Sequence, residues 1–248
     1  MSYDAKSFWE ERLSSKLDLK ATGHRAFSLE YNSWLYKAQT DAIENALSQF
    51  KISTKDISFL DVGSGGGYFI HFFQEKGCSP ITGIDITQSS VIYLREEYPH
   101  LRFHQIDITQ PDILRGESFK LILVMSVFYH ITSDNNFTSA VDNVCRLLDS
   151  KGIILICDLF GRTILPSPKH VRMRGRKEYE GILQKHEINI LNIAPIYYLL
   201  NRTFLPKIGP FIINTLHLGR MLYSTDCWLR KKNIKKNGNL KLLVGQKA

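Results

Sequence analysis

The sequence has few cysteines and no long hydrophobic run. It contains only four cysteines in 248 residues, none of them in a Cys-x-x-Cys pair. This scarcity excludes a disulfide scaffold and favours free thiols in a reducing compartment. Charged residues break every apolar run, such as 152–157, well short of the length that a membrane span needs. Residues 1–6 lack the apolar segment of a signal peptide, so we expect a cytoplasmic protein.

Acidic residues are scarce in the last third of the chain. Residues 1–158 hold 15 Lys and Arg against 20 Asp and Glu, whereas residues 159–248 hold 17 against 4. Such asymmetry indicates two functional regions. The basic region could face a nucleic acid, a membrane surface or an anionic substrate, or it could be a solvated surface without a partner.

Short apolar runs alternate with helical patterns from residue 57 onward. No repeat, proline-rich linker or low-complexity tract interrupts them. Strands alternating with helices at this spacing predict βαβ units in a doubly wound α/β fold with a mostly parallel sheet. The expected strands are 57–62, 81–85, 101–106, 119–124, 152–157, 188–198 and 240–245. The expected helical segments are 1–50, 68–75, 89–97, 136–148 and 210–229.

A glycine-rich segment, residues 61–68 (Asp-Val-Gly-Ser-Gly-Gly-Gly-Tyr), follows the first expected strand. Glycines at such a point let the backbone approach a ligand closely, and the next helix offers unpaired N–H groups. The pyrophosphate-binding pattern Gly-x-Gly-x-x-Gly is not met, because Tyr68 occupies the position of its third glycine. Asp61, two residues before the first glycine, also argues against a pyrophosphate and could receive a cationic amino group.

Asp61, Asp85 and Asp107 come at the ends of the first three expected strands. Asp85 follows Gly63 by 22 residues, and its carboxylate can accept hydrogen bonds from both hydroxyls of a ribose. Asp107 can accept a hydrogen bond from the exocyclic amine of adenine, or it can cap a turn. An amino acid, a ribose and an adenine are the parts of S-adenosylmethionine, which carries no phosphate.

These motifs resemble those of the class I S-adenosylmethionine-dependent methyltransferases that act on small molecules. The resemblance covers about residues 50–160, and the segments that carry it are 60–67, 83–85, 105–108, 120–130 and 152–157. It implies a Rossmann-like seven-stranded sheet whose last strand runs antiparallel between the fifth and sixth strands. It also implies a helical cap over residues 1–50 and a methyltransferase domain over residues 51–248. Around residues 160–238 we expect a substrate-side insertion.

The resemblance also implies which residues hold the cofactor, S-adenosylmethionine. They are Asp61, Gly63, Gly65, Tyr68, Asp85, Ile86, Asp107, Ile108 and Ser126. In the cap, Tyr31 and Trp34 are expected to close over the methionine end, or they only pack the helix on the core. Between the cap and the insertion we expect a substrate pocket with His24, Tyr197 and Tyr198. No metal is expected, because the fourth strand lacks the acidic residues of metal-assisted relatives.

His130 follows the fourth expected strand, near the point where methyl acceptor and sulfonium should meet. It could act as the catalytic base for a hydroxyl, or it could only pack and bond the backbone. We therefore expect a methyltransferase that modifies a small organic molecule at a hydroxyl oxygen. Three alternatives stay open: transfer to nitrogen or carbon of a small natural product, a basic RNA- or membrane-associated binding protein, and a non-catalytic cofactor-binding module.

The expected partners follow from the same segments. Nucleic acid is not the expected substrate, because residues 126–129 lack the Pro-Pro-Tyr motif of enzymes that methylate nucleic-acid amines. The outer helices could form a homodimer surface or only a lid.

Overall fold

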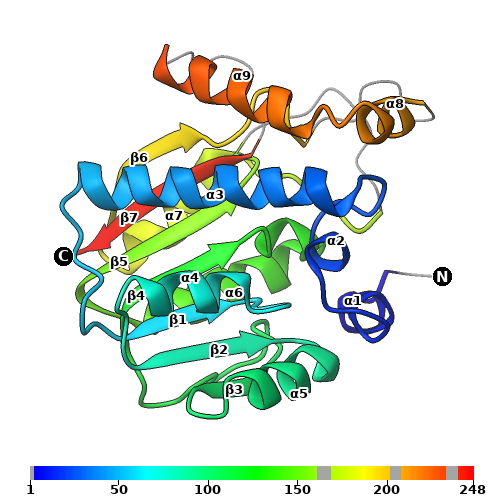
Figure 1. Cartoon of the computed structure of the whole chain (residues 1–248). Helices are drawn as coiled ribbons and strands as arrows, with labels where there is room; N and C mark the ends of the chain where they lie inside the picture. The colour runs from blue at the N-terminus through cyan, green and yellow to red at the C-terminus, as the bar shows by residue number, and fades with distance from the viewer. Residues whose placement is uncertain (1–2, 161–168, 202–207, 233–239) are drawn as a thin grey trace.

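The computed structural model describes residues 3–160, 169–201, 208–232 and 240–248. In this part of the chain, seven strands form one sheet in the order β3-β2-β1-β4-β5-β7-β6, covered by helices on both faces (Figure 1). β7 pairs antiparallel with β5 and β6, and the remaining neighbours are parallel. The predicted doubly wound fold is confirmed, including the last strand between the fifth and the sixth.

The elements lie close to their expected positions. The strands are β1 Phe59–Val62, β2 Ile81–Asp85, β3 Arg102–Gln105, β4 Phe119–Met125, β5 Leu148–Asp158, β6 Ile188–Pro195 and β7 Lys241–Lys247. The α-helices are α1 Ala5–Leu13, α2 Leu19–Thr22, α3 Leu29–Gln49, α4 Tyr68–Glu75, α5 Gln88–Glu97, α6 Asp134–Arg146, α7 Arg176–Lys185, α8 Gly209–Thr215 and α9 Gly219–Lys231. A 3₁₀ turn, η1, covers Phe128–His130.

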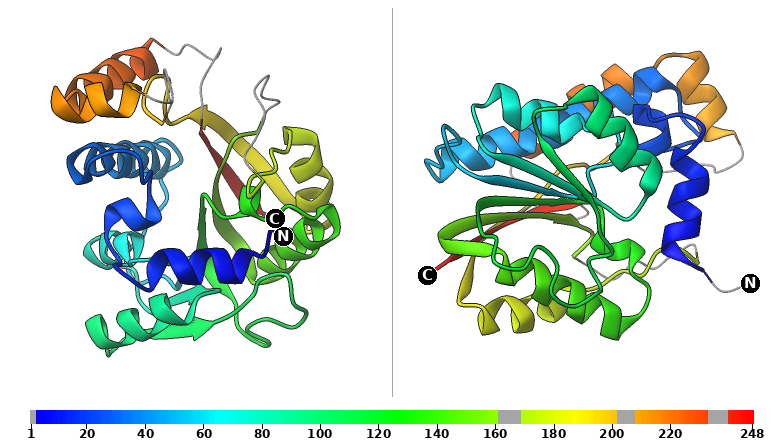
Figure 2. Two further views of the ribbon diagram at one scale, coloured as in Figure 1. Left: turned by 90° about the vertical axis from the view of Figure 1, so that its right-hand side faces the viewer. Right: turned by 90° about the horizontal axis from the view of Figure 1, so that it is seen from below.

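The apolar runs form strands that are buried on both faces. Side chains alternate across a strand, so Leu121 and Leu123 of β4 join one core cluster while Ile122 and Val124 join the other. α3, α4 and α5 contribute to the first cluster, and α6 and α7 to the second. Figure 2 shows these two layers of helices with the sheet between them. This burial fixes the register of the central strands and thus the edge at which they end.

The N-terminal helices have two different places in the fold. α3 lies along one face of the sheet beside α9, and its Ile43 is fully buried in the first core cluster (Figure 1). α1 and α2 instead lie at the edge where β1, β2 and β4 end (Figure 1). Only α1 and α2 are therefore placed like a cap, and the division of the chain at residue 50 stays a prediction.

One expected helix is interrupted. The predicted segment 210–229 is split into α8 and α9, because His217 adopts a left-handed backbone conformation with φ 50°. A residue in this conformation cannot continue a right-handed helix. The expected strand 188–198 is also shorter, since β6 ends at Pro195.

Candidate cofactor and substrate site

A cavity of about 930 Å³ lies at the carboxyl ends of β1, β2 and β4 and is also lined by residues of α1 and α2. Its size is in the range of small-molecule sites, and ligands of open α/β sheets bind at this edge. The cavity brings together most of the residues that the sequence predicts: His24, Gly63, Gly65, Tyr68, Asp85, Ile86, Asp107, Ile108, Ser126, His130 and Tyr197.

The glycine loop between β1 and α4 runs along one wall of the cavity. Gly63 has φ +79°, and a Cβ built there would lie 2.4 Å from Cγ2 of Val127. Gly65 has φ +48°, and a Cβ there would lie 2.9 Å from Cγ2 of Thr22. These backbone angles favour glycine, and the close neighbours leave no space for a side chain. The loop is thus pressed between the segment after β4 and the segment around α2.

Asp85 is the last residue of β2, and its carboxylate holds the glycine loop by a hydrogen bond. Its Oδ2 accepts a hydrogen bond from the Gly65 N–H at 2.9 Å, and its Oδ1 accepts from the Thr87 N–H at 2.9 Å and the Thr87 hydroxyl at 2.7 Å. Burial raises the pKa of Asp85 above its ordinary value. The carboxylate oxygens keep further acceptor capacity toward the cavity that Asp85 lines.

Asp107 and Ile108 occupy the loop after β3. Oδ1 of Asp107 accepts from the Thr109 N–H at 2.9 Å, so the turn-capping role is present while Asp107 also lines the cavity. Asn143 of α6, which the sequence did not single out, holds the loop. Its buried amide donates to the carbonyls of Ile108 at 2.8 Å and Gln110 at 2.7 Å. These bonds fix the position of the loop at the cavity.

Asp61 lies in β1 behind the glycine loop and is not part of the cavity lining. Its side chain is buried, and neither carboxyl oxygen has a hydrogen-bond partner among the described residues. Burial, together with the negative charge of Asp85, raises the pKa of Asp61 to about 8. A buried carboxyl without partners is rare in proteins and indicates a position that a cationic ligand group would satisfy.

The raised pKa of Asp61 predicts a pH-dependent stability. Between about pH 4 and pH 8 the folded chain holds a proton on Asp61 that the unfolded chain has lost. The free energy of unfolding should therefore fall as the pH rises through this window, by up to about 1.4 kcal/mol per unit. Asp61→Asn should remove this part of the slope and stabilise the ligand-free protein at pH 8. Urea unfolding of both proteins from pH 4 to 8 measures the difference, and parallel curves would contradict the prediction.

His130 lies at the end of η1 on the opposite wall of the cavity. Its Nδ1–H donates to the carbonyl of His170 at 3.0 Å, because a carbonyl can only accept. The neutral ring then has its lone pair on Nε2. Removal from water lowers the pKa of His130 to about 4, although the bond to His170 acts in the opposite direction. The ring of Trp9 packs edge-on against it, with centroids 4.9 Å apart. The neutral tautomer suited to accept a proton is thus the one that the structure favours.

α1 contributes cavity residues that sequence reasoning missed. Trp9 and Arg12 line the cavity, and the Arg12 guanidinium donates to the carbonyls of Ala21 and Gly23. Glu10, on the same helix, accepts from the N–H groups of Gln88 at 2.7 Å and Ser89 at 3.0 Å, which begin α5. No local motif marks these residues, since their role depends on where α1 packs.

Three predicted site residues lie elsewhere. Tyr31 is fully buried and stacks on Phe27, Trp34 packs against Tyr223, and Tyr198 is buried outside the cavity lining. The positions of Tyr31 and Trp34 agree with the packing alternative, because their side of α3 faces the α8–α9 region. The α3 residues that do line the cavity are Leu35, Tyr36 and Gln39.

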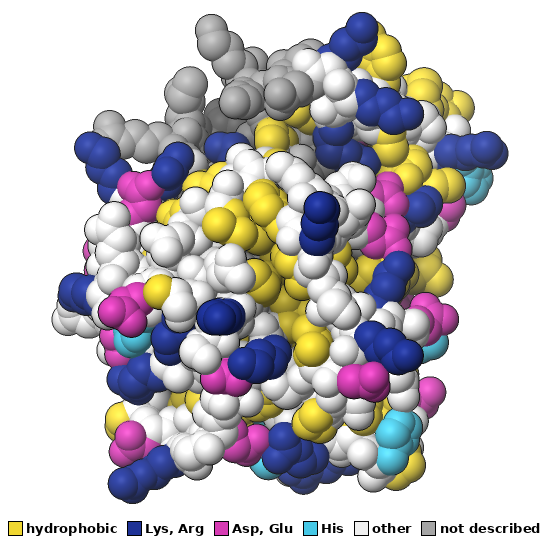
Figure 3. Space-filling model, turned by 90° about the vertical axis from the view of Figure 1, so that its left-hand side faces the viewer, with side chains coloured by type: hydrophobic (Ala, Val, Ile, Leu, Met, Phe, Trp, Pro, Cys, Tyr) yellow, Lys and Arg dark blue, Asp and Glu magenta, His cyan; other side chains and the backbone are white. Residues whose placement is uncertain are grey.

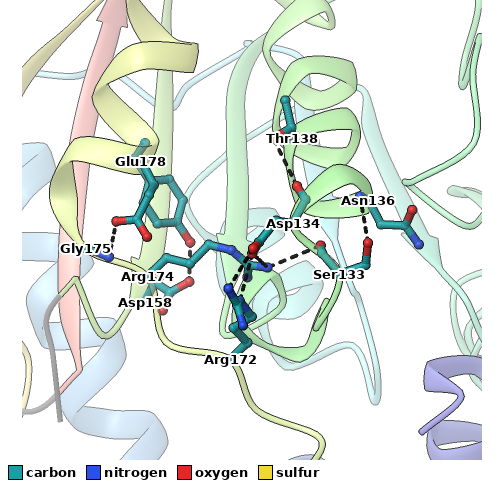
Figure 4. A network of polar contacts seen from close by, with 10 residues as sticks. Ser133, Asp134, Asn136, Thr138, Asp158, Arg172, Arg174, Gly175 and Glu178 are labelled. Atoms are coloured by element: carbon teal, nitrogen blue, oxygen red, sulfur yellow. Dashed lines mark hydrogen bonds and ion pairs between the residues drawn. The ribbon is translucent and has the colours of Figure 1, made fainter. Parts of the chain in front are cut away.

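A polar network holds the chain beside His130 (Figure 4). Arg172 and Arg174 both bind Asp134 at the start of α6, at 2.6 and 3.0 Å, and the Arg172 N–H donates to the Tyr129 carbonyl at 2.8 Å. The Arg174 side chain is buried, with its guanidinium 4.0 Å above the ring of Phe137. Arg174 is therefore not part of a solvated surface, which is one of the alternatives for the basic region 159–248. The network fixes the segment that carries the His170 carbonyl.

Among the described residues, no group of three or more His, Cys, Asp or Glu is placed to hold a metal ion. No helix in the same residues is long and apolar enough to cross a membrane.

Comparisons with known proteins agree with this geometry. Residues 60–156 match the family model of a methyltransferase domain. Magnesium protoporphyrin IX methyltransferase from Synechocystis PCC 6803, solved with bound S-adenosylmethionine, is 11% identical with a TM-score of 0.63; the match covers 100% of this chain and 99% of that one. The N-methyltransferase NodS from Bradyrhizobium japonicum WM9, in complex with S-adenosylhomocysteine, is 14% identical with a TM-score of 0.63, covering 99% of both chains.

A third similar structure is described by a different reaction. The [4+2]-cyclase SpnF is 17% identical with a TM-score of 0.55, and the match covers 78% of this chain and 75% of that one. No curated protein matches the sequence. At these identities the solved structures establish the fold, and the family match identifies a methyltransferase domain over residues 60–156.

Proposed function

We propose that the chain is a class I S-adenosylmethionine-dependent methyltransferase and that it methylates a small organic molecule at a hydroxyl oxygen. The observation that carries the proposal is the state of His130. The ring lines the cavity, and its Nδ1–H is engaged by a backbone carbonyl, so Nε2 keeps a lone pair. A neutral imidazole of this tautomer can accept the proton that a hydroxyl loses when it is methylated.

The site residues fit the cofactor. The glycine loop leaves space that a Cβ at Gly63 would fill, and Asp61 has a carboxyl that lacks a partner. In our assignment Asp85 accepts from the ribose hydroxyls, and Asp107 and Ile108 hold the adenine. When bound, the cofactor supplies a methyl group that its sulfonium has already activated.

The methionine end would be held by opposite charges. Asp61 would accept a hydrogen bond from the amino group from behind the glycine loop, directly or through water, and the positive charge of that group would lower the pKa of Asp61 and favour the ionised carboxylate. Arg12 provides a cation for the carboxylate, because it lines the same cavity and is fixed to the backbone of residues 21 and 23 next to that loop. Tyr68, Ile86 and Ser126 complete the lining on this side.

Alignment of donor and acceptor would supply most of the rate enhancement. Positioning alone can contribute about 7–11 kcal/mol, and a general base adds about 10²–10⁴-fold. The lowered pKa of His130, about 4, makes the ring a weak base, so its contribution belongs at the lower end of that range. Since this pKa lies well below 6, His130 stays neutral between pH 6 and 8. Its ionisation therefore should not change the rate of methyl transfer within this pH range.

Replacing His130 separates binding from chemistry. We expect His130→Ala to lower the turnover of a hydroxyl acceptor about 100-fold while the affinity for S-adenosylhomocysteine changes less than threefold. The measurement is single-turnover methyl transfer with acceptors found by screening, with calorimetry of the same protein as the binding control. His130→Gln, which keeps a hydrogen-bonding group but is no base, should be as slow as His130→Ala.

Transfer to a nitrogen is the second candidate function. The low pKa of His130 favours it, because an amine that is already deprotonated needs no base. Full turnover by His130→Ala with an amine acceptor would select this alternative over the hydroxyl.

A further inference from the structure

α8 carries apolar side chains on its exposed side as well as on its buried side. The buried side packs Gly209, Pro210 and Ile213 against the protein. The opposite side carries side chains that are 41–72% exposed: Ile208, Phe211, Ile212 and Leu216. A cluster of exposed large apolar side chains, in contrast to scattered single ones, commonly marks an interaction site. The exposed side of α8 is therefore a candidate for contact with another apolar surface.

α9 adds basic residues and further apolar side chains. Met221 and Trp228 are 55% and 57% exposed, and Nζ of Lys232 lies 5.9 Å from the Trp228 ring centroid. Arg220 and Lys231 are exposed on the same helix. Figure 3 shows hydrophobic and basic side chains next to each other at the upper right, where α9 lies.

The segment 208–232 itself exposes no acidic side chain. Its one acidic residue, Asp226, is fully buried, where it accepts from the N–H groups of Leu199 at 2.7 Å and Leu200 at 3.0 Å. The neighbouring acids belong to α3: Asp41 pairs with Arg230 at 3.6 Å, and Glu30 lies beside Gly219. The exposed side of the segment thus combines apolar side chains with basic ones.

The apolar helix lies beside the rim of the cavity. Asn214 of α8 accepts from the Ser28 N–H at 2.8 Å and donates to the Ala26 carbonyl at 3.2 Å. Ala26 and its neighbour Arg25 line the cavity. A surface that covers α8 would therefore adjoin the cavity.

We propose that the outer surface of α8 and α9 docks on an anionic lipid bilayer. Exposed aliphatic and aromatic side chains flanked by Lys and Arg are the pattern of helices that lie in the interface plane of a membrane. Docking would bring the rim of the cavity next to amphiphilic molecules in the bilayer. This proposal goes beyond the proposed methyl transfer and does not depend on which atom of the acceptor is methylated.

Two other occupants fit the surface less well. Single-stranded RNA binds by stacking bases on aromatic rings, whereas Ile208, Ile212, Leu216 and Met221 are aliphatic. In a symmetric pair of chains the same patch faces itself, which would bring Arg220, Lys231 and Lys232 of both copies together, and the segment 208–232 offers them no exposed acidic partner. Charge therefore disfavours a symmetric pair, and the aliphatic side chains favour lipid over RNA.

Vesicle co-sedimentation tests the docking surface. The wild-type chain should bind vesicles of equal parts phosphatidylglycerol and phosphatidylcholine, and it should bind pure phosphatidylcholine at least tenfold more weakly. The double variant Lys231→Gln/Lys232→Gln should bind anionic vesicles about 25-fold more weakly, at about fivefold per charge. Phe211→Ser/Leu216→Ser should lose at least tenfold. Raising the salt from 0.1 to 0.5 M should weaken wild-type binding.

Matched controls make the result decisive. Ile92→Ser on α5 removes a side chain that is 48% exposed, away from the patch, and should leave vesicle binding unchanged. Binding of S-adenosylhomocysteine by each variant verifies the fold. The proposal is overturned by a wild-type chain that ignores anionic vesicles, or by an equal loss in Ile92→Ser. It is also overturned by sedimentation velocity showing a dimer that Phe211→Ser/Leu216→Ser dissociates, or by RNA binding that outcompetes the vesicles.

Discussion

Asp85→Asn should weaken the binding of S-adenosylhomocysteine about 10²–10³-fold. The carboxylate accepts from the Gly65 and Thr87 N–H groups and would accept from the ribose hydroxyls. The variant is nearly isosteric but turns one acceptor into an NH₂ donor, which must face either the Gly65 N–H or a hydroxyl. Hydrogen bonds to a charged group contribute about 1.5–3 kcal/mol each, so losing one or two gives this range.

Isothermal titration calorimetry of purified wild type and variant measures this change. Asp107→Asn is the first control, and we expect about a tenfold loss, because Asp107 contributes one contact and the turn that it caps can keep its bond. Asp149→Asn is the second control, since Asp149 lies at the start of β5, outside the cavity lining, and should leave the affinity unchanged. Equal affinities of wild type and Asp85→Asn would remove Asp85 from the cofactor site.

Gly63→Ala should lower the free energy of unfolding by about 2–4 kcal/mol. Part of the loss is the left-handed backbone, which costs an L-residue about 1–2 kcal/mol. The rest is the collision of the new Cβ with Val127, since overpacking costs about 1–3 kcal/mol. The displaced loop should also bind the cofactor poorly.

Urea unfolding with a matched glycine separates the two causes. Gly116 has φ +83°, but a Cβ built there meets nothing within 4 Å, so Gly116→Ala should show the backbone cost alone. Adding Val127→Ala to Gly63→Ala should recover the steric part and leave the backbone part. A Gly63→Ala protein no less stable than Gly116→Ala would show that Val127 yields without cost.

The sequence predicted the residues that follow directly from strand ends. Asp85 and Gly63 stand at the ends of buried runs whose parallel pairing brings them to one edge, so local pattern and topology place them together. Arg12 and Trp9 were not predictable in this way, because a short helix outside the sheet has no register that fixes its location. The same holds for Arg174, whose partner Asp134 is 40 residues away in the sequence.

The orientation of α3 about its own axis explains why Tyr31 and Trp34 lie outside the cavity lining. Tyr31 and Trp34 are aromatic residues near the expected cap, but the cavity side of α3 begins with Leu35 and Tyr36. The apolar pattern of α3 covers so much of its surface that it did not reveal which side faces the site. In 210–229 the apolar pattern continues through His217, so periodicity alone could not reveal the break between α8 and α9.

Glu10 connects α1 to the start of α5, next to the proposed ribose site. Its carboxylate holds the first N–H groups of α5, three residues after the acid that is assigned to the ribose. If ligand binding orders residues 85–89 and thereby stabilises their contact with α1, linkage requires that the docking of α1 raise the ligand affinity by the same free energy. Ligand binding and the docking of α1 on the start of α5 are then coupled in both directions.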